Sequence, residues 1–374
     1  MAHHGPRWRR RRDVLLLAGF LLATSLSAGA RTASLEPVII NNPLLADPRP
    51  WCIGRLVMDR PAHSEIYYEG YEYWGAKIDI ASNVSPGTFQ YKVEIRENEL
   101  RNKKRTILLS YKESVKRGLP NGVVEIDTPW LEQAVSPTPN SRQLIFKEEG
   151  KADYPFTAET YVLAGTAMLN MKSDIAPGGA QEFIRLTNDV YQYITYRDDW
   201  TVPTERGFCI SGALIGGPSH KSEALTQSII LLPGRSSLFV INMRDAVDVD
   251  KQSSLLKTLP DLRKDLREQG YDHGVHILRE GKRQVAGMDA EEVLFSIKEG
   301  GAQVFRFYLL APGNPDTTAQ PHTDIQLMLG DALSDGDKQN GVTPEQAASP
   351  VNEAQAIQAW DTLLNSMHLR PGAM

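Results

Sequence analysis

The chain has 374 residues, of which 41% are hydrophobic and 23% charged, and its formal net charge is −5. This composition and a mean hydropathy of −0.34 exclude a polytopic membrane protein, a collagen repeat and a low-complexity chain. The negative charge also argues against general binding to DNA or RNA, because such binding requires clustered Lys and Arg.

The first thirty residues have the pattern of a secretory signal peptide. Five arginines precede an apolar run from Val14 to Leu26, and Ala28-Gly29-Ala30 supplies a small-residue cleavage pattern. The run is too short to span a membrane, which takes about 20 apolar residues. We predict export to the periplasm through a cleavable signal at 1–30, by the general or the twin-arginine route, and no stable membrane insertion of the mature chain. Cleavage removes five Arg and one Asp from 41 basic and 46 acidic residues, which leaves a net charge of −9.

Hydrophobic periodicity and turn residues predict the same early order of elements, two strands followed by a helix, in both halves of the chain. In the first half they are strands at 66–73 and 76–80, a helix at 85–104, a strand at 159–171 and a helix at 181–196. In the second half they are strands at 228–232 and 237–243, a helix at 253–269, strands at 275–278, 292–297, 304–310 and 324–329, and a helix at 353–367.

Strands that arrive in runs, with helices at fixed places rather than after every strand, favour antiparallel sheets over a doubly wound parallel fold. We therefore predict an α+β fold with two tandem, similar domains at 31–200 and 201–374, joined by a linker at 198–206. Each domain is expected to be an antiparallel sheet with helices packed on one face.

The only two cysteines, Cys52 and Cys209, share an aromatic-Cys-Ile context followed by a small residue and an apolar stretch. An even count in an exported protein favours a disulfide between them. If each cysteine begins its own domain, the two could also lie apart as buried small hydrophobic residues. Both alternatives stay open at the level of sequence.

The sequence contains none of the complete catalytic motifs considered below. Cys209 stands where a G-x-S-x-G elbow around Ser211 would need glycine, and His220 stands where a phosphate loop would need glycine before Lys221. His273 and His276 have a spacing that suits a metal, but no further ligand motif accompanies them. We predict that the protein is not an enzyme and has no cofactor and no metal.

An aromatic group on the first predicted hairpin is a candidate partner interface. It consists of Tyr67, Tyr68, Tyr71, Tyr73 and Trp74. Tyr and Trp are enriched at interface hot spots because they combine a large apolar area with a polar tip. Strand alternation turns about half of such a group inward, so structural packing is the competing interpretation.

Two acidic loops are the other candidate interface. Asp245, Asp248 and Asp250 precede the helix predicted at 253, where carboxylates also stabilise a helix dipole. Asp335 and Asp337 hint at a calcium loop, but the glycine and glutamate that an EF-hand needs are missing from the corresponding positions.

Three spaced motifs together resemble a known family. They are Trp51-Cys52-Ile53-Gly54-Arg55, the segment 207–212 (GFCISG), and Ala359-Trp360-Asp361 with Leu369-Arg370-Pro371. The combination resembles the immunity proteins cognate to type VI secretion phospholipase effectors, over nearly the whole mature chain and in that family's two-domain order. Ser211 departs from the family pattern, in which an acidic residue is expected.

The resemblance implies a periplasmic antitoxin that serves bacterial competition. Such proteins bind their effector, an α/β-hydrolase with a cap over its active site, as a heterodimer. Their two domains clamp the cap and prevent lid opening or substrate access, which requires no catalysis. Two alternatives remain at this stage: a two-lobed periplasmic solute-binding or envelope-assembly protein, and an enzyme with a dispersed site that uses His220, His273 or His276.

Overall fold

The computed structural model describes residues 41–374 except 120–124, 149–155, 177–178, 272 and 334. The predicted signal peptide at 1–30 lies outside the described residues. Of the helices in the described part of the chain, none has the length and apolar character needed to cross a membrane.

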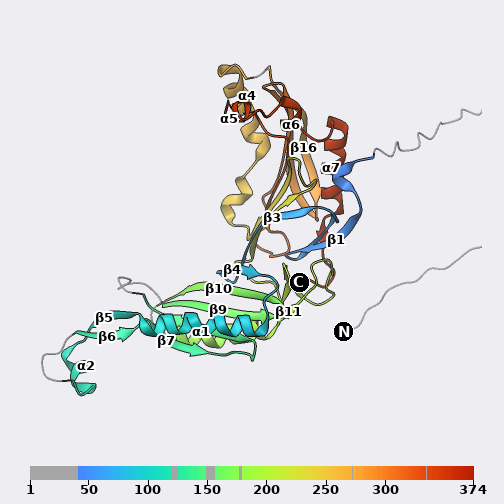
Figure 1. The fold of residues 1–374 in the computed structure, drawn as a ribbon. Coiled ribbons are helices and arrows are strands. Elements are labelled where there is room, and N and C mark those ends of the chain that lie inside the picture. Colours follow the sequence, from blue (N-terminus) through green and yellow to red (C-terminus); the bar gives the residue numbers. More distant parts are fainter. Residues whose placement is uncertain (1–40, 120–124, 149–155, 177–178, 272, 334) are drawn as a thin grey trace, which may run out of the picture. The chain divides into compact units, whose positions relative to one another are not determined.

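A single antiparallel sheet of 12 strands runs through both halves of the chain (Figure 1). Its strands in spatial order are β16 (Val275–Val285), β17 (Met288–Glu299), β18 (Ala302–Ala311), β19 (His322–Leu329), β15 (Ser237–Arg244), β14 (Ala224–Ile230), β3 (Glu65–Tyr73), β4 (Ala76–Ala81), β10 (Ala167–Ile175), β9 (Phe156–Ala164), β8 (Ser141–Phe146) and β7 (Leu131–Val135). The two halves meet where β14 pairs with β3. Counted outward from this pair, each half has the same order: a hairpin, followed by a four-stranded meander read from its last strand to its first.

Two small sheets exchange strands between the halves. β1 (Pro48–Ile53) and β2 (Leu56–Pro61) pair with β20 (His368–Leu369) from the end of the chain. In the matching arrangement, β12 (Gly207–Ile210) and β13 (Ala213–Gly216) pair with β11 (Ile194–Tyr196) from the end of the first half. Each half is therefore completed by a strand from the other.

The four long helices are α1 (Pro86–Asn102), α3 (Ala180–Gln192), α4 (Leu255–Glu268) and α7 (Glu353–Ser366). They begin where their sequences supply caps: Ser85 accepts the Thr88 N–H at 3.1 Å before α1, and Asn352 and Gln355 form a capping box before α7. The shorter elements are η1 (Pro43–Leu45), α2 (Tyr111–Lys116), η2 (Asp248–Gln252), α5 (Asp335–Gln339), α6 (Pro344–Ala347) and the hairpin of β5 (Lys104–Leu108) with β6 (Glu125–Pro129).

The helices cover both faces of the sheet, which corrects the expectation of helices on one face. In the first half, α1 packs on Leu144 and Phe146 of β8, whereas α3 packs on Ile145 between them. Successive side chains of a strand point to opposite faces, so α1 and α3 lie on opposite sides. In the second half, α4 packs on Val293 and Phe295 of β17, whereas Leu294 belongs to the core that contains α7.

The α+β class with antiparallel strands is confirmed, as are most predicted elements. The predicted strand at 159–171 is wrong, since the chain turns at Gly165, which has a φ of +59°, and forms the hairpin β9–β10. The predicted helix at 181–196 ends at Gln192, and residues 194–196 form β11 instead.

Candidate partner-binding surface

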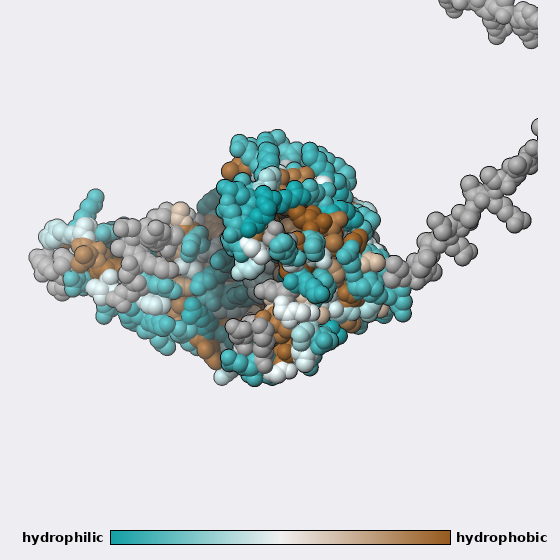
Figure 2. Space-filling model, turned by 90° about the horizontal axis from the view of Figure 1, so that it is seen from above, coloured by the Kyte–Doolittle hydropathy of each residue, from teal (hydrophilic) through white to brown (hydrophobic). Residues whose placement is uncertain are grey.

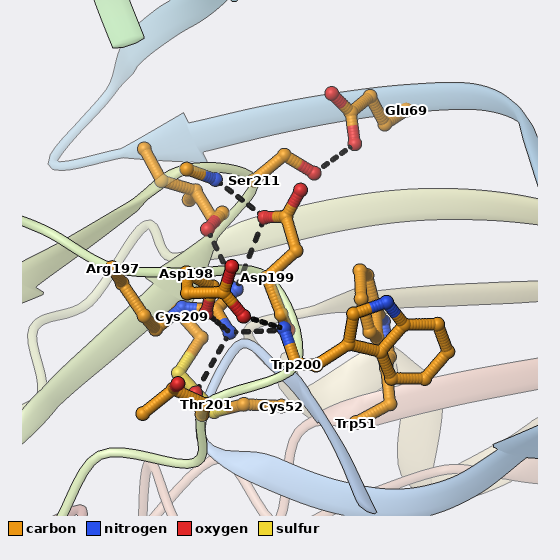
Figure 3. Close-up of polar contacts among 12 residues, drawn as sticks. Trp51, Cys52, Glu69, Arg197, Asp198, Asp199, Trp200, Thr201, Cys209 and Ser211 are labelled. Carbon is orange, nitrogen blue, oxygen red and sulfur yellow. Dashed lines mark hydrogen bonds and ion pairs between the residues drawn. A yellow bond between two sulfur atoms is a disulfide. The ribbon is translucent and has the colours of Figure 1, made fainter. Parts of the chain in front are cut away.

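The hairpins β1–β2 and β12–β13 meet at the disulfide that Figure 3 shows. The structure joins Cys52 on β1 and Cys209 on β12 by a disulfide, with their Cα atoms 5.9 Å apart. Gly54 and Cys209 also exchange two backbone hydrogen bonds, of 3.1 and 2.8 Å. The bridge thus covalently links the first hairpin of one half to the first hairpin of the other.

Two buried arginines hold the segment between the halves. Arg197 follows β11 and donates to the carbonyl oxygens of Asp199 and Thr201, at 2.8 and 3.0 Å, and of Ile210 at 2.9 Å. Burial lowers the pKa of Arg197. The predicted linker at 198–206 is therefore an ordered segment, and hydrogen bonds from Arg197 hold its first residues (Figure 3).

Arg370 follows β20 as Arg197 follows β11, and it makes equivalent contacts. Its guanidinium donates to the carbonyl oxygens of Pro203, Glu205 and Gly207 at 2.6–2.7 Å, and burial lowers its pKa as well. The backbone N–H of Arg370 donates to the carbonyl of Arg55, just as the N–H of Arg197 donates to Gly212. Arg370 lies in the last of the three motifs that carry the family resemblance, so this motif maintains the fold.

Ser211, the departure from the family pattern, lies in a polar cluster under β3. Its hydroxyl donates to the Glu69 carboxylate (Figure 3). The Tyr71 hydroxyl donates to the same carboxylate oxygen at 3.0 Å. Burial raises the pKa of Tyr71 above its ordinary value, with the Glu69 charge as a further cause. A serine at this position therefore places a hydroxyl against a carboxylate supplied by β3.

The aromatic group divides into an exposed and a buried part. Tyr67, Tyr68 and Trp74 are 71%, 55% and 37% exposed, whereas Tyr71 and Tyr73 are buried at 7% and 1%. A register shift places Tyr67 as an extra residue opposite the Ser228–Ile229 step, so two consecutive tyrosines are exposed. The expectation of direct partner contact is corrected for Tyr71 and Tyr73, because alternation along β3 turns them into the core.

Trp74 occupies the turn between β3 and β4 with a φ of +53°. A bulky side chain in this left-handed region is an outlier, and such strain concentrates at functional sites. The ring centroid of Trp74 lies 6.0 Å from that of His220. Tyr67, Tyr68 and Trp74 are therefore the exposed members of the aromatic group.

The first acidic loop also divides. Asp250 is buried, accepts hydrogen bonds from Arg244 at 2.8 and 2.9 Å and from the Val247 N–H at 2.9 Å, and has its pKa lowered to about 2, chiefly by the bonds from Arg244. It fixes the turn before α4, so the expectation of partner contact is corrected for Asp250. Asp245 and Asp248 instead line an open hollow of about 610 Å³.

The second acidic loop forms the short helix α5, which contains Asp335 and Asp337. The side chain of Asp337 is half-buried. Across the described residues, no cluster of three or more His, Cys, Asp or Glu side chains could hold a metal ion.

A groove that the sequence did not predict crosses the middle of the large sheet. Cross-strand pairs trace one continuous face from Met168, which packs under α1, to Tyr308, which packs under α4. No described helix covers the strands between these two helices on this face. The groove there measures about 480 Å³, and its lining includes Tyr68, Glu72, Lys77, Asp79, Asn242, Arg244 and Asp324.

Two family models match consecutive parts of the chain. The N-terminal domain model of Tle cognate immunity protein 4 matches residues 49–197, and its C-terminal domain model matches residues 201–372. No curated protein sequence matches the chain.

Solved structures share the fold. The apo immunity protein TplEi of the T6SS from Pseudomonas aeruginosa is 20% identical with a TM-score of 0.69, and the Tle4-Tli4 complex contains a chain that is 19% identical with a TM-score of 0.70. TplEi complexed with an "L" peptide is 19% identical with a TM-score of 0.66. Each likeness covers 87% of this chain and 98% of the other.

Proposed function

Because the chain belongs to the Tle cognate immunity protein 4 family, we propose that it is an antitoxin that binds and inhibits a cognate type VI secretion phospholipase effector. The match of both domain models, in order and over nearly all of residues 49–372, is the observation that carries this proposal. A related fold has been solved in a complex described as Tle4-Tli4.

The uncovered face of the large sheet is the proposed binding surface. It lies between α1 and α4, so a partner segment seated there would be flanked by a helix from each half. Tyr68 lines the groove, and Tyr67 and Trp74 are proposed as further contacts because their side chains are exposed. Asp245, Asp248, Asp335 and Asp337 are proposed as contacts of the second half.

The proposed mechanism is steric. A phospholipase with a cap must open it to meet its substrate, and a protein that holds the cap or blocks substrate entry stops the reaction. Shape complementarity suffices for this, so we propose that the antitoxin is not an enzyme and uses no cofactor.

The proposed location is the periplasm, reached through the signal at 1–30. A disulfide between Cys52 and Cys209 supports this proposal, because such bonds persist in oxidising compartments and are rare in the cytosol.

A variant of Tyr68 tests the binding surface. Replacing Tyr68 by Ser is expected to weaken effector binding about thirtyfold, which corresponds to a hot-spot loss of about 2 kcal/mol. Tyr193→Ser is the matched control, since Tyr193 is 59% exposed and directly follows α3, which packs on the opposite face of the sheet. Calorimetry with the purified effector measures both variants, and equal affinities for them would contradict the proposed surface.

A further inference from the structure

One segment of the first half has no counterpart among the described residues of the second. Between α1 and β7 the chain builds β5, α2 and β6, whereas no described helix or strand lies between α4 and β16. We name the described residues of this segment, 103–119 and 125–129, the arm. Among the described strands, β5 and β6 pair only with each other. The arm is connected to the rest of the half through Trp130, whose indole donates to the Lys104 carbonyl at 3.1 Å.

The arm exposes large apolar side chains that the fold does not need. Leu108, Tyr111 and Val115 are 75%, 67% and 50% exposed. Tyr111 and Val115 stand four residues apart on α2 and therefore share one face of the helix. Figure 2 shows hydrophobic residues among hydrophilic ones at the end of the molecule that carries the arm.

The arm is also basic in a chain whose net charge is negative. The described residues of the arm contain six Lys and Arg and three acids, Glu113, Glu125 and Asp127, and five of the six cations and one of the acids lie at 103–116. Lys103 and Arg105 form ion pairs with Glu99 and Glu132 at the base of the arm. Lys112, Lys116 and Arg117 are exposed and have no ion-pair partner among the described residues.

We propose that the arm is a docking site for an anionic phospholipid surface. Peripheral proteins bind such surfaces through exposed apolar side chains next to lysines and arginines. The apolar side chains enter the headgroup region, and the cationic groups contact the lipid phosphates. The hollows described above contain no arm residue, and a protruding patch meets a flat, fluid surface without a complementary shape. Docking would hold the antitoxin where a phospholipase meets its substrate.

Vesicle binding by the chain 31–374 tests this proposal directly. We expect salt-sensitive co-sedimentation with vesicles of phosphatidylglycerol and phosphatidylethanolamine, and little with vesicles of phosphatidylcholine alone. Removing the charge of Lys112 or Lys116 is expected to weaken binding about fivefold each. Leu108→Ser combined with Val115→Ser is expected to weaken it further than either change alone.

The double variant Lys112→Glu with Lys116→Glu reverses two charges of the arm. Lys264→Glu with Arg267→Glu on α4 is its matched control, because it changes the charge of two exposed residues by the same amount. Circular dichroism verifies that each variant is folded. Absence of binding at low salt, or equal binding by arm and control variants, would overturn the proposal. So would arm variants that still bind vesicles but no longer inhibit the effector, because the arm would then be a protein contact. The vesicle assay contains no effector, so its failure is distinguishable from failure of the proposed function.

Discussion

The two halves of the molecule share an order of elements but fill the same position with different chemistry. Beneath α3 of the first half, Gln143 of β8 contacts the hydroxyls of Thr160, Thr187 and Tyr191 in a neutral network. The corresponding strand of the second half is β17, where Glu292 forms ion pairs with Arg279 and Arg283 beneath α7.

The helices over these networks differ in the same way. α3 buries only Thr187 and Tyr191, whereas α7 buries Ala356, Ala359, Trp360, Leu363 and Leu364. The second half thus has the larger apolar contact and the first half has the arm. The order of elements that both halves share maintains the fold. We expect partner-specific function in the features that differ between the halves.

The largest effect is expected from the core of the second half. Trp360 is fully buried, donates from Nε1 to Glu292 at 2.8 Å and packs against Phe307. Trp360→Ala is expected to lower the free energy of unfolding by about 3–5 kcal/mol through lost burial and the cavity left behind. Urea denaturation measures this, with Trp360→Phe as the milder control. A loss below about 1 kcal/mol would show that α7 does not anchor this half.

Breaking the covalent link between the halves comes next. The disulfide closes a loop with a sequence separation of 157 residues. Cys52→Ser or Cys209→Ser is expected to cost about 2–5 kcal/mol, because the cross-link restricts the unfolded chain. The two single variants and the double variant are expected to have the same midpoint of thermal unfolding. A double variant as stable as the wild type would mean that the bridge does not form.

Variants of Arg197 and Arg370 test whether the two exchanged strands are held equivalently. Arg197→Met and Arg370→Met each remove the guanidinium donor from at least three carbonyl oxygens, of which those of Ile210, Pro203 and Gly207 accept in buried hydrogen bonds, so each variant is expected to cost about 1–3 kcal/mol. Lysine is not expected to restore stability, since one ammonium cannot reproduce the planar guanidinium fork. Unequal costs in chemical denaturation would show that the two exchanged strands are not held equivalently.

The smallest effect concerns the turns before the helices of the uncovered face. Ser85 caps α1 with a neutral hydroxyl, but Asp250 must be ionised to hold the turn before α4. Its pKa is lowered to about 2 from an ordinary 3.8, chiefly by hydrogen bonds from Arg244. The stabilisation is therefore present above about pH 4 and lost as the pH falls towards 2.

Asp250→Asn is expected to be less stable than the wild type at pH 6 and closer to it at pH 2.5. Denaturant unfolding at the two pH values measures the difference. If the difference in unfolding free energy between the wild type and Asp250→Asn is the same at both pH values, the ionised Asp250 carboxylate does not stabilise the turn.

Local patterns predicted the elements, but pairings between distant segments had no local signal. Hydrophobic spacing located α1, α4 and α7 because each has a cap and an apolar stripe. The exchange of β11 and β20 was not predictable, since three-residue and two-residue strands carry almost no pattern. The groove was missed because the polar residues Asp79, Asn242 and Asp324 become neighbours only once β3 and β14 pair. Trp51, Arg55 and Arg370 carried the family resemblance because they form the centre of the fold, which leaves the partner surface to less recognisable residues.

The most direct test of the central claim is to titrate the phospholipase activity of the cognate effector with the purified chain 31–374, in parallel with size-exclusion chromatography. The account predicts inhibition that is complete at a one-to-one ratio, with both proteins in a single peak. Full phospholipase activity with two separate peaks would contradict it and would favour a small ligand as the occupant of the groove.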